Sequence, residues 1–160
     1  MDALFAPALA YLGLFSVHFT GFALAALRPV PAPKPLRGEA PHVAVLIPAY
    51  REGEVVVRNV ESVLAQRYPA GRIETIVIAD RCGEGLIATL SAMPITLHAV
   101  NFETSTKAKA MRYALHRLDE RAEVVIVLDA DNLAHPDMVA TMVADIQAGA
   151  AAVQGARLEK

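Results

Sequence analysis

The sequence predicts an α/β fold with a mostly parallel sheet, preceded by one transmembrane helix. From His42 onward, short apolar runs alternate with segments of helical periodicity. Strands alternating with helices of about ten residues form βαβ units, in which each crossover helix packs on a parallel sheet. A separate stretch, Ala3 to Leu27, contains no Asp, Glu, Lys or Arg. Together these observations predict a membrane-anchored α/β domain.

The apolar stretch is long enough to cross a membrane. At about 1.5 Å per residue, a helix of this length spans a hydrocarbon core of roughly 30 Å. A cleaved signal peptide is the alternative, but Asp2 stands where such a peptide carries Lys or Arg, which favours an anchor. Arg28, Lys34 and Arg37 follow the stretch, so the positive-inside rule predicts a single-pass protein of the inner (plasma) membrane with its remainder in the cytoplasm.

The predicted organisation is an anchor at residues 1–28, a proline-rich linker at 29–41 and a folded domain at 42–160. The linker is expected to be extended and semi-rigid because the stretch from Arg28 to Pro41, both included, contains five prolines. A lone cysteine, Cys82, offers neither a disulfide partner nor a second thiol for a metal, as expected for a cytoplasmic domain. A net charge of −2, without a stripe of basic and aromatic residues, argues against nucleic acid as a partner.

The first predicted strand, 43–47, is an apolar run that is expected to end at Pro48, since proline cannot donate to a ladder. Residues 54–66 carry valines at helical spacing and predict a helix, which Pro69 and Gly71 stop. Further predicted elements are strands at 73–79, 95–100 and 124–128, helices at 86–92, 105–118 and 136–147, and an additional strand at Ala150 to Gln154. The uninterrupted apolar run 124–128 predicts a strand that is buried on both faces.

Two carboxylates, Asp129 and Asp131, directly follow this apolar run. Ligands of open α/β sheets collect at the carboxyl ends of the strands. Two oxygen donors there suit Mg²⁺ or Mn²⁺ carrying a diphosphate. The alternative is structural: the acidic pair, or another upstream polar residue such as His135, caps the helix that Pro136 begins.

Polar clusters follow three of the predicted strands, and in a parallel sheet all three emerge at one edge. They are Tyr50 with Arg51 and Glu52, Asp80 with Glu84, and Asp129 with Asp131. Lysines at a helix amino terminus oppose the helix dipole, so Lys107 and Lys109 indicate an anionic partner, although solvation of an exposed face also explains them. The chain has no Gly-x-Gly-x-x-Gly or Walker-type loop, which removes the main support for ordinary dinucleotide and P-loop sites.

Four motifs occur in the order and at the separations of a known family. They are Ile47 to Glu52, Asp80 to Cys82, Lys107 to Met111 and Val127 to Asn132. From His42 to the carboxyl terminus, the chain resembles the amino-terminal half of a family-two inverting glycosyltransferase of the membrane-bound cellulose-synthase-like branch. The resemblance implies a Rossmann-like GT-A domain that binds a nucleotide-sugar, of which this chain holds an incomplete part.

The resemblance also implies a nucleotide-diphosphate sugar donor, with UDP as the nucleotide, and a saccharide or lipid-linked acceptor as in polysaccharide biosynthesis. In this family the loop after the first strand borders the uracil and ribose, which implies contacts from Ala49, Tyr50 and Glu52. The acid after the second strand reads the base, a role that falls on Asp80.

The same resemblance places Lys109 or Lys107 in the nucleotide pocket. It assigns Asp129 and Asp131 to the sugar-nucleotide and the divalent ion, Mg²⁺ or Mn²⁺, with Asp131 as the direct metal ligand. Such an ion neutralises charge that builds on the departing nucleoside diphosphate.

Three departures from the family pattern stand out. Arg51 replaces a common Asn, and Leu86 replaces a Thr or Ser that often follows the second acidic position, here Glu84. The sequence ends at Lys160, before the half that supplies the acceptor site and the carboxylate acting as general base, so no residue is assigned as that base.

Two other interpretations remain open. One is a catalytically silent nucleotide-binding or membrane-assembly module that retains the donor pocket. The other is a response-regulator-like phosphoacceptor domain, in which the acidic cluster holds Mg²⁺ and one Asp is phosphorylated. In any of these interpretations the sheet exposes an edge and apolar surface, so the isolated chain is expected to be marginally stable or to associate.

Overall fold

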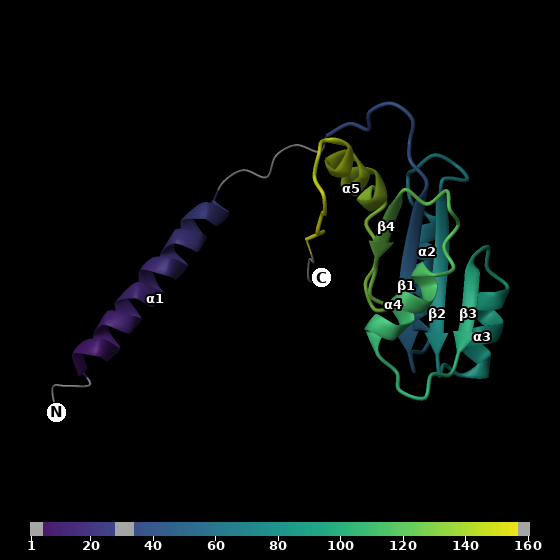
Figure 1. The fold of residues 1–160 in the computed structure, drawn as a ribbon, viewed down its shortest axis with the longest axis horizontal. Helices are drawn as coiled ribbons and strands as arrows, with labels where there is room; N and C mark the ends of the chain where they lie inside the picture. Colours follow the sequence, from purple (N-terminus) through teal and green to yellow (C-terminus); the bar gives the residue numbers. More distant parts are fainter. Residues whose placement is uncertain (1–4, 28–33, 157–160) are drawn as a thin grey trace. The chain divides into compact units, whose positions relative to one another are not determined.

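The computed structural model describes residues 5–27 and 34–156, which belong to two separate compact units (Figure 1). The second unit begins at Lys34. Of the predicted linker, residues 29–33 lie outside the described residues. Residues 34–41 belong to the second unit, so that unit contains all the described residues of the predicted linker and domain.

The amino-terminal unit contains helix α1, Phe5–Ala26, in agreement with the predicted helix. With 22 residues, this helix is long and apolar enough to cross a membrane. They include no Asp, Glu, Lys or Arg, so the helix is apolar on all its faces. A helix apolar all round suits lipid or a buried core and does not suit an exposed position in water.

The second unit is built on a four-stranded sheet with the order β3-β2-β1-β4. All three neighbouring pairs are parallel, which confirms the predicted parallel α/β sheet (Figure 1). The strands are β1 Val43–Tyr50, β2 Ile73–Asp80, β3 Thr96–Val100 and β4 Val124–Val127.

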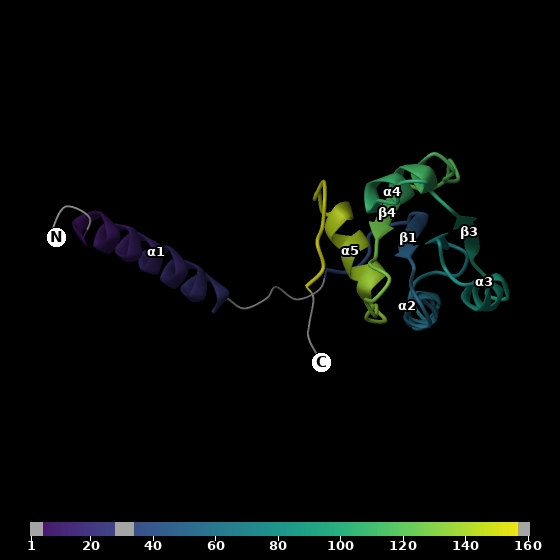
Figure 2. The same ribbon diagram turned by 90° about the horizontal axis from the view of Figure 1, so that it is seen from below.

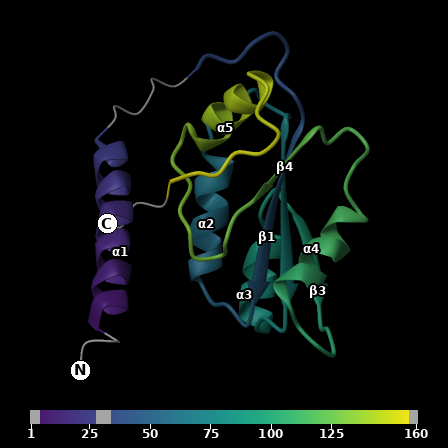
Figure 3. The same cartoon turned by 60° about the vertical axis from the view of Figure 1, so that its left-hand side comes forward.

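Helices cover both faces of this sheet. Figure 2 shows α4 on one side of the sheet and α2 and α3 on the other, and Figure 3 shows α2 and α4 on opposite sides of β1. One core cluster joins residues of α2, α3 and α5 to alternate residues of β1 and β2, and a smaller cluster joins α4 to the intervening ones. The helices are α2 Val55–Leu64, α3 Glu84–Ser91, α4 Lys107–Leu115 and α5 Met138–Gln147.

Strand β1 does not end at Ile47, as the sequence suggested, but continues through Pro48 to Tyr50. Along a strand, the backbone N–H and C=O groups of every second residue point to the same neighbouring strand. The Leu46 carbonyl accepts from the Leu128 N–H, so Leu46 points to the β4 side. Pro48 therefore also faces β4, beyond the last β1–β4 pair, Leu46 with Val127. Its missing N–H interrupts no ladder there.

The prediction that the strand before Asp129 is buried on both faces is wrong. Ile126 is 7% exposed and packs in the larger cluster, but Val125 and Val127 on the opposite face are 40% and 47% exposed. The reason lies in α4, which packs mainly on β1 and β2 and leaves this face of β4 open. In the described part of the chain, β4 is also an edge strand.

The additional strand expected at Ala150 to Gln154 is not observed. Gly149 turns the chain after α5 with a φ of 103°. A strand needs a paired neighbour, and the sheet formed by the described residues ends at β4 without pairing to this segment.

The segment before β1 is attached to α5. Gln147 accepts from the Arg37 N–H at 2.8 Å and donates to the Arg37 carbonyl at 2.8 Å. Lys34 forms an ion pair with Asp145 at 2.9 Å. The residues that precede β1 are therefore attached to α5 by hydrogen bonds and an ion pair.

We expect Leu46→Ala to lower the free energy of unfolding by about 2–5 kcal/mol, because deleting a buried side chain leaves a cavity in the core. Leu46 is 0% exposed, whereas Leu115 at the end of α4 is 49% exposed. The matched control, Leu115→Ala, should change stability by less than about 0.5 kcal/mol. Urea unfolding of the detergent-solubilised chain, followed by circular dichroism, measures both. Equal losses would contradict the assigned core.

Candidate nucleotide-sugar and metal site

Strands β1 and β2 end at the same level of the sheet, with Tyr50 opposite Asp80. The chain then leaves each strand through an arginine in the left-handed region, Arg51 at φ 53° and Arg81 at φ 54°. The Arg51 N–H donates to the Asp80 carbonyl at 3.0 Å, and the Arg81 N–H donates to the Val100 carbonyl at 3.1 Å. Non-glycine residues in this region are strained by about 1 kcal/mol or more. Two strained turns thus lie side by side at the carboxyl edge.

A cavity of about 390 Å³ opens at this carboxyl edge, and most of the predicted site residues line it. The polar clusters after β1, β2 and β4 converge there, as the parallel arrangement predicted. The predicted residues in its lining are Ala49, Tyr50, Glu52, Asp80, Lys107, Asp129 and Asp131, accompanied by Pro48, Ser105, Thr106, Ala110 and Ala130. Lys109 and Glu84 are not among the lining residues.

Asp80 is the buried acid of the cavity, with 3% exposure. Its Oδ1 accepts from the Phe102 N–H at 3.1 Å. A buried carboxylate needs such a partner, since an unpaired charge is costly to remove from water. The bond fixes the carboxylate and joins the end of β2 to the loop that leads into α4.

Lys107 forms an ion pair with Asp129, so α4 and the segment after β4 meet across the cavity. The two side chains are 55% and 46% exposed. A pair this exposed contributes only about 0–1 kcal/mol to stability. Thr106, which precedes Lys107, caps α4 by accepting from the Lys109 N–H at 3.1 Å. The cap fixes the start of the helix and with it the position of Lys107.

Lys109 is directed elsewhere. Its Nζ lies 3.4 Å from the Thr104 carbonyl oxygen and 5.0 Å from the centre of the Phe102 ring. Of the two lysines that the sequence offered for the pocket, the cavity therefore contains Lys107.

The capping interpretation of Asp129 and Asp131 is not supported by the start of α5. The N-cap residue of this helix is Asp137, whose own side chain makes no capping bond, and the Val139 N–H in the first turn donates to Gln66 Oε1 at 3.0 Å. His135 Nδ1 instead accepts from the Asp137 N–H at 3.3 Å. Both acidic side chains line the cavity.

The residues present fit a divalent ion that shares its coordination with a phosphate ligand. Among the described residues, no group of three or more His, Cys, Asp and Glu side chains forms a metal cluster. Asp129 and Asp131 contribute oxygen donors to the cavity, which suit Mg²⁺ or Mn²⁺. With two carboxylates, water and phosphate oxygens can complete the coordination.

Sequence reasoning missed three polar residues that contact the segment carrying Asp129 and Asp131: Asn59 and Ser62 of α2, and Gln66 just after that helix. Asn59 donates to the carbonyls of Asp129 and Asn132, both at 2.6 Å. Ser62 and Gln66 bond to the backbone farther along the same segment. One signal was available, because polar residues at i, i+3 and i+7 interrupt the apolar spacing of a helix that packs on the sheet.

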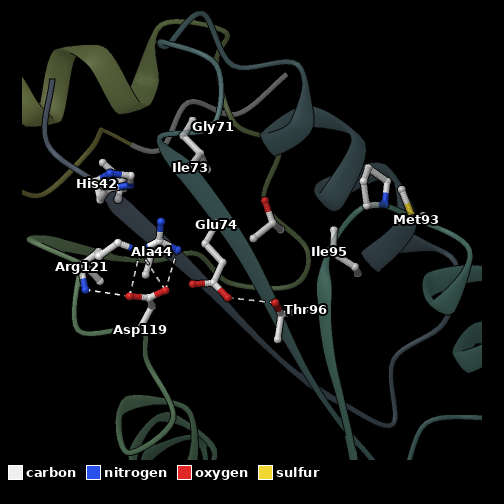
Figure 4. A pocket seen from close by; sticks show the side chains of 14 residues that line it. His42, Ala44, Gly71, Ile73, Glu74, Met93, Ile95, Thr96, Asp119 and Arg121 are labelled. Carbon is white, nitrogen blue, oxygen red and sulfur yellow. Dashed lines mark hydrogen bonds and ion pairs between the residues drawn. The ribbon is translucent and has the colours of Figure 1, made fainter.

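A second cavity, of about 430 Å³, lies at the opposite edge of the sheet, between the amino-terminal parts of β1, β2 and β3 (Figure 4). None of the predicted site residues lines it. Asp119 and Arg121 pair across its rim, and Glu74 accepts from the Thr96 hydroxyl at 2.9 Å. The hydrogen bond from the Arg121 side chain is the main reason why the pKa of Asp119 falls to about 2. Asp119, Arg121 and Glu74 thus each have a partner within the lining of this cavity.

Comparison with known proteins agrees with this architecture. Residues 40–159 match the family described as glycosyltransferase like family 2. The fold is similar to the mannosyltransferase PcManGT from Pyrobaculum calidifontis, solved in complex with GDP-Man and Mn²⁺. The TM-score is 0.67 at 24% identity, over 88% of this chain and 42% of that one. No curated protein matches the chain.

TarS from S. aureus has a similar fold, with a TM-score of 0.54 and 19% identity over 67% of this chain and 19% of that one. A TarS chain of residues 1–349 in complex with UDP gives the same TM-score and identity, with 31% of that chain covered. The present chain thus spans less than half of each of these structures.

The sheet of this chain is therefore the parallel α/β sheet of GT-A glycosyltransferase folds. Because the family match covers most of the sequence, the chain belongs to the glycosyltransferase like family 2.

Cys82 provides a reporter beside the cavity, because its Sγ lies 3.7 Å from the carbonyl oxygens of Ala49 and Asp80. Burial raises the pKa of the Cys82 thiol, against the opposing effect of backbone hydrogen bonds from Glu52 and Arg51. A raised pKa leaves less thiolate at a given pH, and the thiolate is the reactive form. We therefore expect slower reaction with a disulfide reagent at neutral pH than in the urea-unfolded chain, with an inflection at higher pH. An inflection at or below that of the unfolded chain would contradict the burial of this thiol.

Proposed function

We propose that the chain binds the nucleotide-diphosphate sugar donor of an inverting glycosyltransferase of the membrane-bound cellulose-synthase-like branch. One observation carries the proposal: Asp80, Lys107, Asp129 and Asp131 line a single cavity at the carboxyl edge of the sheet. It is supported by the family match and by two structurally similar proteins, one solved with GDP-Man and Mn²⁺ and one with UDP.

In this proposal the β1 and β2 side of the cavity holds the nucleoside. Tyr50 is 47% exposed at the rim, where its ring can stack on a base. Ala49 and Glu52 flank it and contact the base and ribose. Asp80 keeps one oxygen for the Phe102 N–H and offers the other to a donor on the base, such as the uracil imino group.

The α4 and β4 side holds the diphosphate. Asp129 and Asp131 hold Mg²⁺ or Mn²⁺, with Asp131 as the direct ligand, and the bound ion neutralises charge on the departing diphosphate. Lys107 supplies a fixed positive charge to the same phosphates. Its present partner, Asp129, is half exposed, so the ion pair can be exchanged for a metal and phosphate contact at little cost.

We further propose that α1 anchors the protein in the inner membrane with the catalytic domain in the cytoplasm. The support is the length and composition of α1 and the basic residues Arg28, Lys34 and Arg37 that follow it. A donor site on this side meets cytoplasmic nucleotide-sugars. The acceptor would be a saccharide or a lipid-linked sugar at the membrane, as in polysaccharide biosynthesis.

Titration of the detergent-solubilised chain with UDP, with and without Mn²⁺, tests the donor site. We expect Mn²⁺ to tighten UDP binding and Asp131→Asn to abolish this enhancement, because the variant lacks one of two carboxylate ligands. Mn²⁺ alone should bind weakly, since the site depends on phosphate oxygens to complete the coordination. Tighter binding of GDP than of UDP would still support a nucleotide-sugar site but would identify guanine, and not uracil, as the base. A folded chain that binds neither nucleotide would refute the donor site and favour an assembly module.

The two lysines of α4 form a matched pair of variants. Lys107→Ala should weaken UDP binding about 10-fold or more, as expected for the loss of one charge-assisted bond to phosphate. Lys109→Ala removes the same charge from the same helix but from outside the cavity, and should have little effect. Isothermal titration calorimetry measures both. A larger loss of UDP affinity in Lys109→Ala than in Lys107→Ala would assign the phosphate contact to Lys109.

A further inference from the structure

A row of polar side chains on one face of α2 and just after its end contacts the acidic segment, residues 129–139. The row consists of Asn59, Ser62 and Gln66, at positions i, i+3 and i+7 of the chain. Asn59 and Ser62, three residues apart, share one face of α2, and Gln66 follows the C-cap residue Ala65. The same helix packs on the sheet through Val56, Val60 and Val63, so the polar row is fixed relative to the sheet.

Asn59 is the most buried member, with 0% exposure. Its Nδ2 donates to the carbonyls of Asp129 and Asn132, each at 2.6 Å. Its Oδ1 is buried without a hydrogen-bond partner, an arrangement that costs about 1–3 kcal/mol. Rotating the amide would place that oxygen against two carbonyl oxygens, so the two donor bonds determine its orientation.

Ser62 and Gln66 extend the attachment along the segment. The Ser62 hydroxyl accepts from the Ala134 N–H at 2.9 Å. Gln66 donates through Nε2 to the His135 carbonyl at 2.7 Å and accepts through Oε1 from the Val139 N–H at 3.0 Å. All these bonds reach the backbone of the segment, so they fix its path and do not depend on its side chains.

This attachment matters because the segment has no strand or helix between the end of β4 and the start of α5. Asp129 and Asp131 lie within it, so the positions of their carboxylates follow from the path of its backbone. Metal sites require ligands held within about 0.5 Å of the productive geometry. Residues that orient metal ligands typically change metal affinity 10- to 100-fold when they are replaced.

We propose that Asn59, Ser62 and Gln66 are positioning residues that hold the backbone of residues 129–139 so that Asp129 and Asp131 can bind the metal together with the diphosphate. The inference rests on the proposed donor and metal site. It goes beyond that site because the three residues lie outside the lining of the cavity and act on the metal ligands only through the backbone.

The test compares Asn59→Ala and Ser62→Ala with Ser62→Thr, which keeps the hydroxyl, and with Arg58→Ala, an exposed residue of the same helix. Two quantities are measured on the detergent-solubilised full chain. One is the ratio of UDP affinities with and without Mn²⁺. The other is hydrogen exchange of backbone amides in residues 129–139. Ser62→Ala keeps the test decisive if Asn59→Ala, which unpairs two carbonyls, fails to fold.

We expect UDP affinity in Mn²⁺ to fall about 10- to 100-fold in Asn59→Ala and to fall also in Ser62→Ala. Affinity without Mn²⁺ should stay unchanged, whereas a general loss of structure would lower both. Exchange of residues 129–139 should be faster in these variants only, and Ser62→Thr and Arg58→Ala should behave as wild type.

Three outcomes are distinguishable. Folded Asn59→Ala and Ser62→Ala variants that keep the full Mn²⁺ enhancement would overturn the positioning role. Equal losses of affinity with and without Mn²⁺ would also overturn it, because the row would then serve the fold alone. If wild type shows no Mn²⁺ enhancement, the proposed metal site fails instead, and unchanged exchange in the variants would then refute the attachment as well.

Discussion

The parallel pairing of β1 with β2 is the constraint on which the candidate site depends. It places Tyr50 opposite Asp80 and sends both strands out of the sheet at the same edge. Because β4 joins β1 in the same direction, Asp129 arrives at that edge from the other side. Strand direction therefore brings the acids of the cavity together, and α4 completes the lining with Lys107 and Ala110.

The acids of the cavity are held in two different ways. Asp80 is buried, and its carboxylate is fixed directly by the Phe102 N–H. Asp129 is half exposed, and its position follows from a backbone carbonyl that Asn59 holds. A fixed carboxylate suits recognition of one ligand group, whereas an exposed carboxylate on a fixed backbone can exchange a lysine partner for an ion.

Local sequence predicted most of the fold, because apolar alternation and polar strand ends are properties of adjacent residues. The meeting of Tyr50, Asp80, Asp129 and Asp131 in one cavity followed from the parallel direction of the strands. Local sequence did not indicate which strands and helices would become neighbours in the folded domain. Pro48 is tolerated because β4 pairs with β1 only as far as Leu46, and Val127 is exposed because α4 lies elsewhere on the sheet. Asn59 bonds to a carbonyl 70 residues away, which no periodicity reveals.

The two left-handed turns after β1 and β2 also limit which residues can occupy positions 51 and 81. Branched side chains are poorly tolerated at φ values of 53° and 54°, whereas Asn and Asp adopt them with less strain. Asn at position 51 would therefore keep the turn and remove a positive charge, whereas Arg81 also donates to the Phe102 and Glu103 carbonyls, which Asn would release. Position 51, beside Tyr50 of the lining, can thus change its charge while the backbone stays the same, whereas position 81 is tied to the loop whose Phe102 N–H fixes Asp80.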